Sequence, residues 1–350
     1  MALDIALLRD LCKTPGAPGF EDPIRQLIIK SIENHVDSYE IDNLGNLVAF
    51  KQGKKQNDRP KVMLAAHMDE ISFMVNHIDE NGFIRFNPLG GFDPKTLTAQ
   101  RVIIHGEKDL IGVLGTKPIH VMSPEERNKV VKLEDFFIDC GLPKEEVEKV
   151  VAIGDPITRE RDLIAMGECI NSKSLDNRVS VFVLVEVLKQ LKDHEADIYG
   201  VFTVQEEVGI RGAQVAAHTI NPDFGLAIDT TIAYDLPGAQ PHEQVTQLGK
   251  GAAIKIMDAS TICDARMVRF LKQVAKERDI AWQPEVLTAG GTDTAGVQRT
   301  GKQGAIAGAV SIPTRHLHQV IEMCHTQDIS AAIQLLQEAL VALTDFDWQR

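Results

Sequence analysis

The stretch KVMLAAHMDE, residues 61–70, indicates the fold class of this 350-residue chain. Its first six residues form a short apolar run, which is typical of a strand buried on both faces of a sheet. His67 follows directly, so a side chain that can bind a metal comes where the strand ends. Similar apolar runs occur at 197–205, 223–229 and 303–310. Strands of this kind are expected in the middle of an α/β sheet.

Segments of helical length and periodicity separate these runs. Apolar residues at helical spacing predict helices near the N-terminus, from Asp22 onward, from about Asp176, and over 211–218, 265–277 and 329–343. Parallel strands need crossover connections of a dozen or more residues, and helices usually supply them. The sequence therefore predicts an α/β fold with a mostly parallel sheet flanked by helices on both faces.

Residues 71–163 have a different character. Short β-like runs follow one another at 71–78, 82–88, 101–106 and 110–116, broken by Gly, Pro, Asp and Asn. This pattern is typical of a small β-barrel or sandwich. We therefore predict one α/β domain made of residues 1–70 and 164–350, interrupted by an inserted β-rich domain of residues 71–163.

The composition argues against several classes of protein. Lys and Arg number 37 against 50 Asp and Glu, so the net charge is −13, and no basic tract is present. This balance disfavours nucleic acids and anionic membranes as partners. No apolar run approaches the ~20 residues that cross a bilayer. The five cysteines form no C-x-x-C pair, which disfavours a thiolate zinc site. We expect a cytoplasmic protein with reduced cysteines.

Acids and histidines gather where strands of the predicted sheet end. They are His67, the pair Glu206 and Glu207, Asp229, Asp176 at the start of a helix, and His318 past the last strand. In an open α/β sheet, ligands bind beyond the carboxyl ends of the strands. Two His and several carboxylates there would suit zinc, cobalt or manganese.

Each of these residues also has an ordinary explanation. A lone His after a strand is usually a loop residue, an Asp that begins a helix is most often a cap, and a Glu pair in a loop is usually solvated. Asp229 is harder to explain this way, because it lies within an apolar run and an unpaired buried carboxylate is strongly unfavourable. The joint pattern is therefore more specific than any one member.

Six motifs in order resemble those of the M42 family of dinuclear metallo-aminopeptidases, which includes glutamyl and tetrahedral aminopeptidases. They are AHMDEISFMV (66–75), KSLDNRVSV (173–181), VQEEVGIRGA (204–213), LAIDTT (226–231), GGTDTAG (290–296) and SIPTRHLH (311–318). PLGGFDP (88–94) resembles the family's GGWDP segment, with Phe92 in the aromatic place. The resemblance covers nearly the whole chain.

The resemblance implies a role for each candidate residue. Asp176 would bridge two divalent metal ions per subunit, zinc or cobalt, with manganese as a further option. His67 and Asp229 would complete one site, and Glu207 and His318 the other. Glu206 would be the catalytic base, and Asp69 would orient the His67 ring. Because consecutive side chains on an extended segment point opposite ways, Glu206 and Glu207 need a turn or an intervening water to serve one site.

The implied activity is removal of N-terminal residues from peptides that have a free N-terminus, by a hydroxide that bridges the metals. The resemblance also implies dimers that assemble into a dodecamer, with the insertion as dimerisation and lid domain. One alternative is a hydrolase of N-acylated or other small amides that uses the same site. Another is a non-catalytic assembly protein, which would have lost a ligand or the base.

Three positions leave questions open. His316 stands where the family commonly has Tyr, and on an extended segment it would face the same side as His318. Gln319 replaces the family's Ser after the ligand His. The GGTD segment 290–293 resembles a family loop near the site, but these residue types are equally explained by a tight turn with a helix cap at Thr292 or Asp293.

Overall fold

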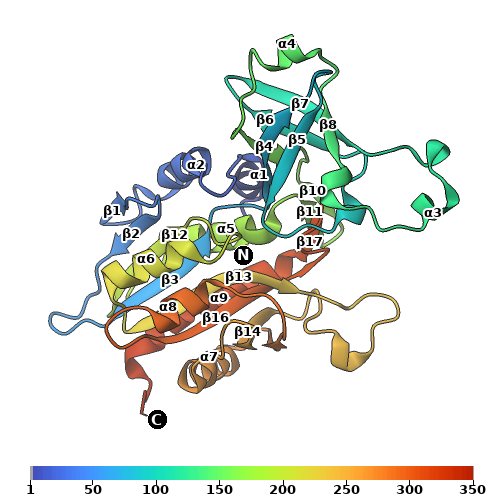
Figure 1. Cartoon of the computed structure of the whole chain (residues 1–350). Coiled ribbons are helices and arrows are strands. Elements are labelled where there is room, and N and C mark those ends of the chain that lie inside the picture. The colour runs from blue at the N-terminus through green and yellow to red at the C-terminus, as the bar shows by residue number, and fades with distance from the viewer. Residues whose placement is uncertain (1–2, 350) are drawn as a thin grey trace.

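A computed structural model describes residues 3–349 of the chain. Its strands form two separate sheets, a large open sheet and a small closed barrel that stands at one end of it (Figure 1). The nine α-helices of the described residues are α1 (Ile5–Lys13), α2 (Asp22–Ile32), α3 (Pro124–Arg127), α4 (Lys144–Val147), α5 (Leu175–Gln190), α6 (Arg211–Ile220), α7 (Ala265–Glu277), α8 (Asp293–Arg299) and α9 (Thr326–Ala342). Among these, none is long and apolar enough to cross a membrane.

The large sheet combines parallel and antiparallel strands. Its strands are β1 (Ser38–Ile41), β2 (Leu47–Lys51), β3 (Lys61–His67), β10 (Ile164–Met166), β11 (Cys169–Ser172), β12 (Asp197–Thr203), β13 (Phe224–Ile232), β14 (Ala252–Met257), β15 (Trp282–Val286), β16 (Ile306–Arg315) and β17 (Glu322–His325). The centre, β12-β3-β13-β16, is parallel as predicted. The hairpins β1-β2 and β10-β11 add antiparallel strands at both edges. A hairpin needs a turn of only a few residues, whereas parallel strands need a longer crossover.

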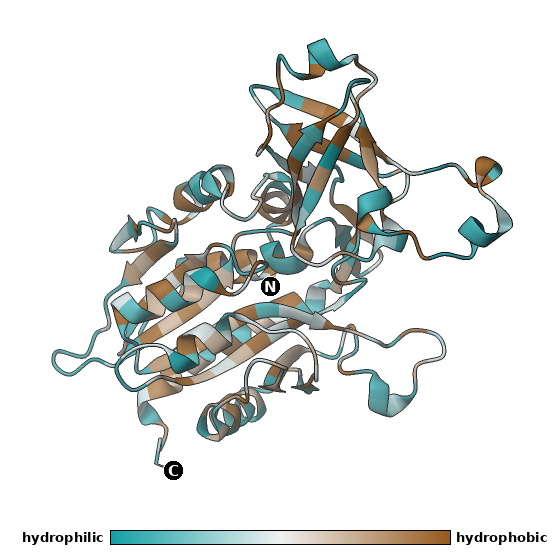
Figure 2. Cartoon of the chain, in the orientation of Figure 1, coloured by the Kyte–Doolittle hydropathy of each residue, from teal (hydrophilic) through white to brown (hydrophobic). Residues whose placement is uncertain are grey.

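Helices cover both faces of this sheet, as the alternation of strands and helices predicted. Leu64 of β3 faces α5 and α9, whereas its neighbours Met63 and Ala65 face the other side with residues of α6 and α8. Alternate side chains of a strand point to opposite faces, so a strand buried on both sides is apolar throughout. Figure 2 shows the brown strands inside and the teal outer faces of the helices.

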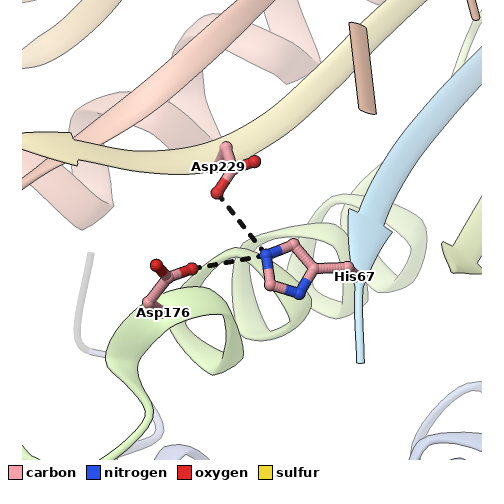
Figure 3. Close-up of side chains that lie close together, drawn as sticks. All are labelled: His67, Asp176 and Asp229. Atoms are coloured by element: carbon pink, nitrogen blue, oxygen red, sulfur yellow. Dashed lines mark ion pairs between the residues drawn. The ribbon is translucent and has the colours of Figure 1, made fainter. Parts of the chain in front are cut away.

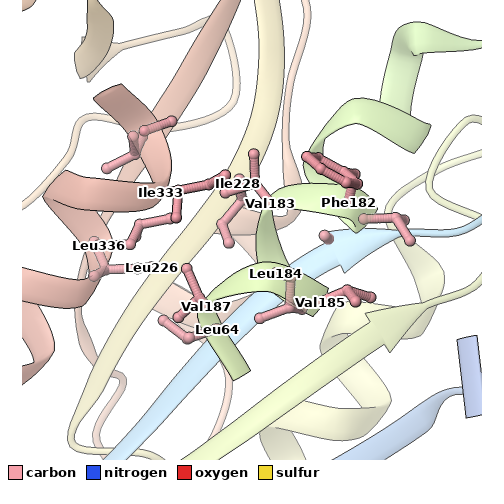
Figure 4. Packing of buried hydrophobic residues seen from close by; sticks show 14 of the residues in the cluster. Leu64, Phe182, Val183, Leu184, Val185, Val187, Leu226, Ile228, Ile333 and Leu336 are labelled. Carbon is pink, nitrogen blue, oxygen red and sulfur yellow. The ribbon is translucent and has the colours of Figure 1, made fainter. Parts of the chain in front are cut away.

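Helix α5 lies in the densest part of the core. Val183 and Val187 pack with Leu226 and Ile228 of β13 and with Leu336 of α9 (Figure 4). Nearly every residue of α5 from Leu175 to Leu188 is buried, because sheet, α1 and α9 surround it. A helix that is apolar on all sides is a core helix. Its first turn, which carries Asp176, is therefore fixed by packing.

The barrel is closed by six strands in the order β4-β5-β8-β7-β6-β9. They are β4 (Ser72–Ile78), β5 (Ile84–Leu89), β6 (Arg101–His105), β7 (Asp109–Gly115), β8 (Phe137–Asp139) and β9 (Pro156–Arg159). Phe73, Ile104, Ile138 and Ile157 fill its interior and form a core separate from that of the large sheet. All six strands lie inside the predicted insertion. The division into domains at residues 70 and 164 itself stays a prediction.

Candidate metal centre

The candidate ligands meet at the carboxyl end of the parallel strands. His67 is the last residue of β3, and Asp229 lies within β13, which continues to Ile232 rather than ending there. Asp176 lies at the N-terminal end of α5, where its own backbone is not helical, and its side chain points toward His67 (Figure 3). Segments more than a hundred residues apart in the chain are thus brought to one edge of the sheet, where ligands bind in open α/β folds.

His67, Asp176 and Asp229 form a first group. The Nε2 atom of His67 lies 3.3 Å from Oδ1 of Asp176 and 3.8 Å from Oδ1 of Asp229 (Figure 3). One donor atom from each residue lies within 4.8 Å of the other two. All three side chains are buried, with at most 5% of each residue exposed. Such a cluster of an imidazole and two carboxylates can hold a cation.

Asp176, Glu207 and His318 form a second group of the same kind. The Nε2 atom of His318 lies 3.1 Å from Oδ2 of Asp176 and 3.7 Å from Oε2 of Glu207. Asp176 therefore presents Oδ1 to the first group and Oδ2 to the second. The structure brings all five predicted ligands together in two groups that share one carboxylate.

The chain places His318, and not His316, beside Asp176. Strand β16 ends at Arg315, and both His316 and His318 have left-handed backbone angles, with φ of 60° and 58°. The segment is therefore not extended, and the strand alternation that left both histidines equivalent does not apply. His316 instead lines the neighbouring cavity.

A backbone turn separates Glu206 from Glu207, as their adjacency required. Strand β12 ends at Thr203, Gln205 has a φ of 54°, and the N–H groups of Gly209 and Ile210 donate to the carbonyl of Glu206. Glu207 reaches the second group, whereas Glu206 stays outside both groups, with Oε2 3.9 Å from His67 Nε2. Both side chains thus face the same site.

Asp69 contacts the His67 ring more closely through its backbone carbonyl than through the predicted carboxylate. The ring nitrogen Nδ1 of His67 lies 3.1 Å from the backbone carbonyl of Asp69 and 3.5 Å from its carboxylate. The carboxylate instead accepts the backbone N–H groups of Glu206 and Glu207, each at 3.0 Å. Asp69 therefore joins the end of β3 to the Glu206–Glu207 turn.

Two further carboxylates at the site, those of Glu322 and Glu21, were not predicted from the sequence. Glu322 accepts the backbone N–H of Asp176 at 2.8 Å and that of His318 at 3.3 Å, so it fixes two members of the second group. Glu21 accepts the N–H groups of Gly19 and Gln205, behind the same turn. Glu322 lies in the apolar run VIEMC, and an acid within such a run is a signal that it has buried partners.

The site concentrates negative charge away from water. Burial, aided by the charge of Asp176, raises the pKa of Glu207 to about 8. Burial likewise raises the pKa of Glu206 and of Asp229. For His318, burial works to lower the pKa, but Asp176 and Glu207 outweigh it and raise the pKa to about 10. The protein's own positive groups do not fully offset the negative charge of several of these buried carboxylates. A bound cation would supply the missing positive charge.

The donor set fits divalent cations. Imidazole nitrogens and carboxylate oxygens are the ligands that zinc, cobalt and manganese accept. The Oε1 atom of Glu207 is buried and has no hydrogen-bond partner among residues 3–349. A buried carboxylate oxygen without a partner is costly, and coordination to a cation removes that cost.

A cavity of about 640 Å³ opens beside the two groups. The metal-capable residues line it together with apolar side chains, which include those of Ile232, Leu236 and Leu287. Gly290, Gly291 and Thr292 of the GGTD segment also line it, while Asp293 begins α8 and accepts the Thr203 hydroxyl. The segment is thus both a cavity wall and the start of a helix.

Comparison with known proteins identifies the family. The M42 glutamyl aminopeptidase family matches residues 45–335. A lysyl aminopeptidase of Pyrococcus furiosus is 34% identical over 99% of both chains. The structure of aminopeptidase APDkam598 from Desulfurococcus kamchatkensis has a TM-score of 0.92 and 39% identity, covering 96% of this chain and 94% of that one.

A structure of the TET1 peptidase from Pyrococcus horikoshii, which can assemble into a tetrahedron or a large octahedral shell, has a TM-score of 0.85. It is 32% identical and covers 96% of this chain and 98% of its own. These matches extend over nearly the whole chain and confirm the resemblance seen in the six motifs. The chain therefore belongs to the M42 glutamyl aminopeptidase family, a family of peptide-hydrolysing enzymes.

Proposed function

We propose that this chain removes N-terminal residues from peptides and that two divalent cations hold the reacting groups. The main support for two cations is the position of Asp176, because its Oδ1 atom faces the first ligand group and its Oδ2 atom faces the second. The aminopeptidases to which the chain is similar support the same activity.

Each residue of the two groups has a place in this proposal. His67 and Asp229 would hold one cation, Glu207 and His318 the other, and Asp176 both. Zinc or cobalt, or else manganese, would act there as a Lewis acid on the peptide carbonyl and lower the pKa of a water toward ~7. Asp69 would fix the position of the His67 ring through its carbonyl and that of the Glu206–Glu207 turn through its carboxylate.

Glu206 is the residue we assign as general base. It points to the site from outside both ligand groups, and 10% of its side chain is exposed to solvent. Burial raises the pKa of its carboxyl, which makes uptake of a proton easier. Glu206 would take a proton from the attacking water and give it to the leaving amine.

The volume and the lining of the cavity limit which substrate residues can bind beside the two ligand groups. Its volume of about 640 Å³ is in the range of small-molecule sites and suits the first residue of a peptide. Apolar side chains form part of its lining. Substrates are thus expected to enter with the N-terminal side chain against this apolar part of the lining and the scissile carbonyl beside Asp176.

We also propose that copies of the chain assemble, first as dimers and then as a dodecamer, with the barrel as contact and lid. The assembly described for the TET1 peptidase supports this. The loop between β7 and β8 projects from the barrel and exposes Ile119 and Val121, with 61% and 64% of each residue accessible (Figure 1). Burying such side chains in an interface would favour association.

Turnover of a panel of aminoacyl p-nitroanilides, each with a free or an acetylated amine, tests the activity. Cobalt-loaded protein should cleave the free-amine substrates, and a chelator should abolish cleavage. Glu206→Gln should lose about 10²–10⁴-fold in kcat and keep its cations, whereas Glu207→Gln should lose cation binding. Cleavage confined to acetylated substrates would indicate an N-acyl amide hydrolase instead, and a protein without activity or cations would contradict the proposal.

A further inference from the structure

Arg159 links the barrel to the second ligand group. It is the last residue of β9 and only 1% exposed, but its guanidinium points out of the barrel toward the large sheet. The Nη1 group donates to the carbonyl of Gln319, and the Nη2 group donates to the Ser174 hydroxyl at 3.1 Å. Nη2 also lies 3.8 Å from a carboxylate oxygen of Glu70, which compensates the buried charge.

The two segments that Arg159 joins carry members of the second group. Gln319 follows His318, and Ser174 precedes Asp176 by two residues. A guanidinium is planar and presents its donors in a fixed geometry, so it holds its acceptors at a set separation. One side chain from the barrel therefore fixes the spacing between the segments that position Asp176 and His318.

A second part of the barrel reaches the same group. Phe92 lies under the Arg159 guanidinium, whose carbon is 5.9 Å from the ring centre, and it stacks on Phe73 at 4.3 Å. In the preceding turn, a Cβ added to Gly91 would lie 3.5 Å from Nδ1 of His318, and one added to Gly90 would lie 3.4 Å from Cβ of Glu207. The backbone of this turn is therefore packed closely against both residues.

The first group is built differently. Its members His67 and Asp229 belong to β3 and β13 in the centre of the large sheet, and they share only Asp176 with the second group. Glu322, which accepts the N–H groups of Asp176 and His318, also lies close enough to Arg159 for the two charges to attract. The contacts of the barrel thus concentrate on one of the two groups.

We propose that Arg159 is a positioning residue through which the barrel shapes the second ligand group, so that the cation held by Glu207 and His318 depends more on the barrel than the cation held by His67 and Asp229. This inference rests on the proposed pair of cations. It assigns the insertion a role in the active site of its own chain, separate from any role in assembly.

Cobalt binding to Arg159→Met tests the inference without reference to catalysis. Equilibrium dialysis and the visible absorption of bound Co²⁺ give the affinity of each site in the wild type and the variant. We expect the cobalt ion beside Glu207 and His318 to bind about 10- to 100-fold more weakly, as for other residues that orient metal ligands. The ion beside His67 and Asp229 should lose much less affinity, because it shares only Asp176 with the second group. Arg159→Lys, which keeps the charge but not the planar fork, should fall between the wild type and Arg159→Met.

Arg85→Met is the matched control. Arg85 also belongs to the barrel, donates to a backbone carbonyl and lies over a phenylalanine ring, but it is remote from the ligands and exposed. It should bind both cobalt ions normally. Equal weakening of both sites in Arg159→Met, or no weakening, would overturn the inference. If Arg159→Met does not fold, Arg159→Lys takes its place. Weaker cobalt binding mainly at the second site of that variant supports the inference, and equal or unchanged affinities at both sites overturn it.

The test separates this inference from the proposed function. A wild type that binds two cobalt ions and cleaves peptides, beside an Arg159→Met variant with two unchanged affinities, removes only the role of Arg159. A wild type that binds no cobalt removes the proposed function itself.

Discussion

The carboxylate of Asp69 accepts the backbone N–H of Glu206 at 3.0 Å, and its second oxygen accepts the next N–H along the chain. The carbonyl of the same residue lies 3.1 Å from the ring of His67. One fully buried residue thus sets the distance between a candidate ligand and the candidate base. This relation explains why an acid two residues beyond His67 matters without binding a cation.

Asp69→Asn should therefore reduce turnover although no ligand is lost. An amide has one acceptor oxygen, so one of the two N–H groups of the turn would face an NH₂ group. We expect a loss of about 10- to 100-fold in kcat/KM and of about 1–3 kcal/mol in the free energy of unfolding. Steady-state kinetics and urea unfolding of the cobalt-loaded variant measure both. Turnover equal to that of the wild type would contradict this role.

The stability of cation-free protein should fall as the pH rises from 6 to 8. The pKa of Glu207 is raised by burial to about 8 and that of Glu322 to about 7, whereas in the unfolded chain both are near 4.5. The folded state then binds more protons than the unfolded state in this window, so raising the pH favours unfolding. Bound cations would keep these carboxylates ionised and remove the effect.

Thermal unfolding at several pH values, with a chelator and with excess Co²⁺, measures this difference. We expect the gain in Tm from cobalt to grow between pH 6 and pH 8. Glu207→Gln should flatten the pH dependence of the chelated protein. A cobalt effect on Tm that does not change with pH would contradict the prediction.

Glu70→Gln should be strongly destabilising. Burial works to raise the pKa of Glu70, but Lys173, Arg178 and Arg159 outweigh it and lower the pKa to about 2. Removing one partner of a buried charge network leaves uncompensated charge and costs about 3–5 kcal/mol. As control, Glu146→Gln breaks an exposed pair with Lys149 and should cost less than about 1 kcal/mol. Equal losses in urea unfolding would contradict the prediction.

Substrates with an apolar N-terminal residue should be preferred. Ile232, Leu236 and Leu287 line the cavity, and the buried Lys255 near them is already paired with Glu285. A charged substrate side chain would lose its water against these apolar side chains. We expect higher kcat/KM for leucyl and methionyl than for glutamyl and lysyl amides. Leu287→Ala should lower kcat/KM more for leucyl than for alanyl substrates, and a preference for charged residues would contradict this.

Much of the central fold could be predicted because burial leaves a strong pattern. β3 contains the apolar run VMLAA and β13 the apolar run FGLAI, since both strands are covered on both faces, and α7 has a clear helical period. The edge strands lack such a signal. All four residues of β1 are exposed, so its side chains show no alternation between apolar and polar.

His67, Glu207 and Asp229 could be found because each follows or lies within an apolar run. Asp176 and His318 could be found from their places at the start of a predicted helix and past the last predicted strand. The choice between His316 and His318 could not be made from periodicity, because left-handed backbone angles end the strand pattern there. Arg159 and Ser174 also gave no signal, since their contact depends on how a separate barrel docks on the sheet. Contacts between the barrel and the large sheet are not encoded in local spacing.

An anomalous-difference map of a cobalt-loaded crystal tests most directly whether Asp176 is shared by two cations. We predict two peaks per chain, one beside His67 and Asp229 and one beside Glu207 and His318, with a different oxygen of Asp176 facing each. A single peak, or cobalt bound away from Asp176, would contradict the shared carboxylate and the mechanism proposed from it.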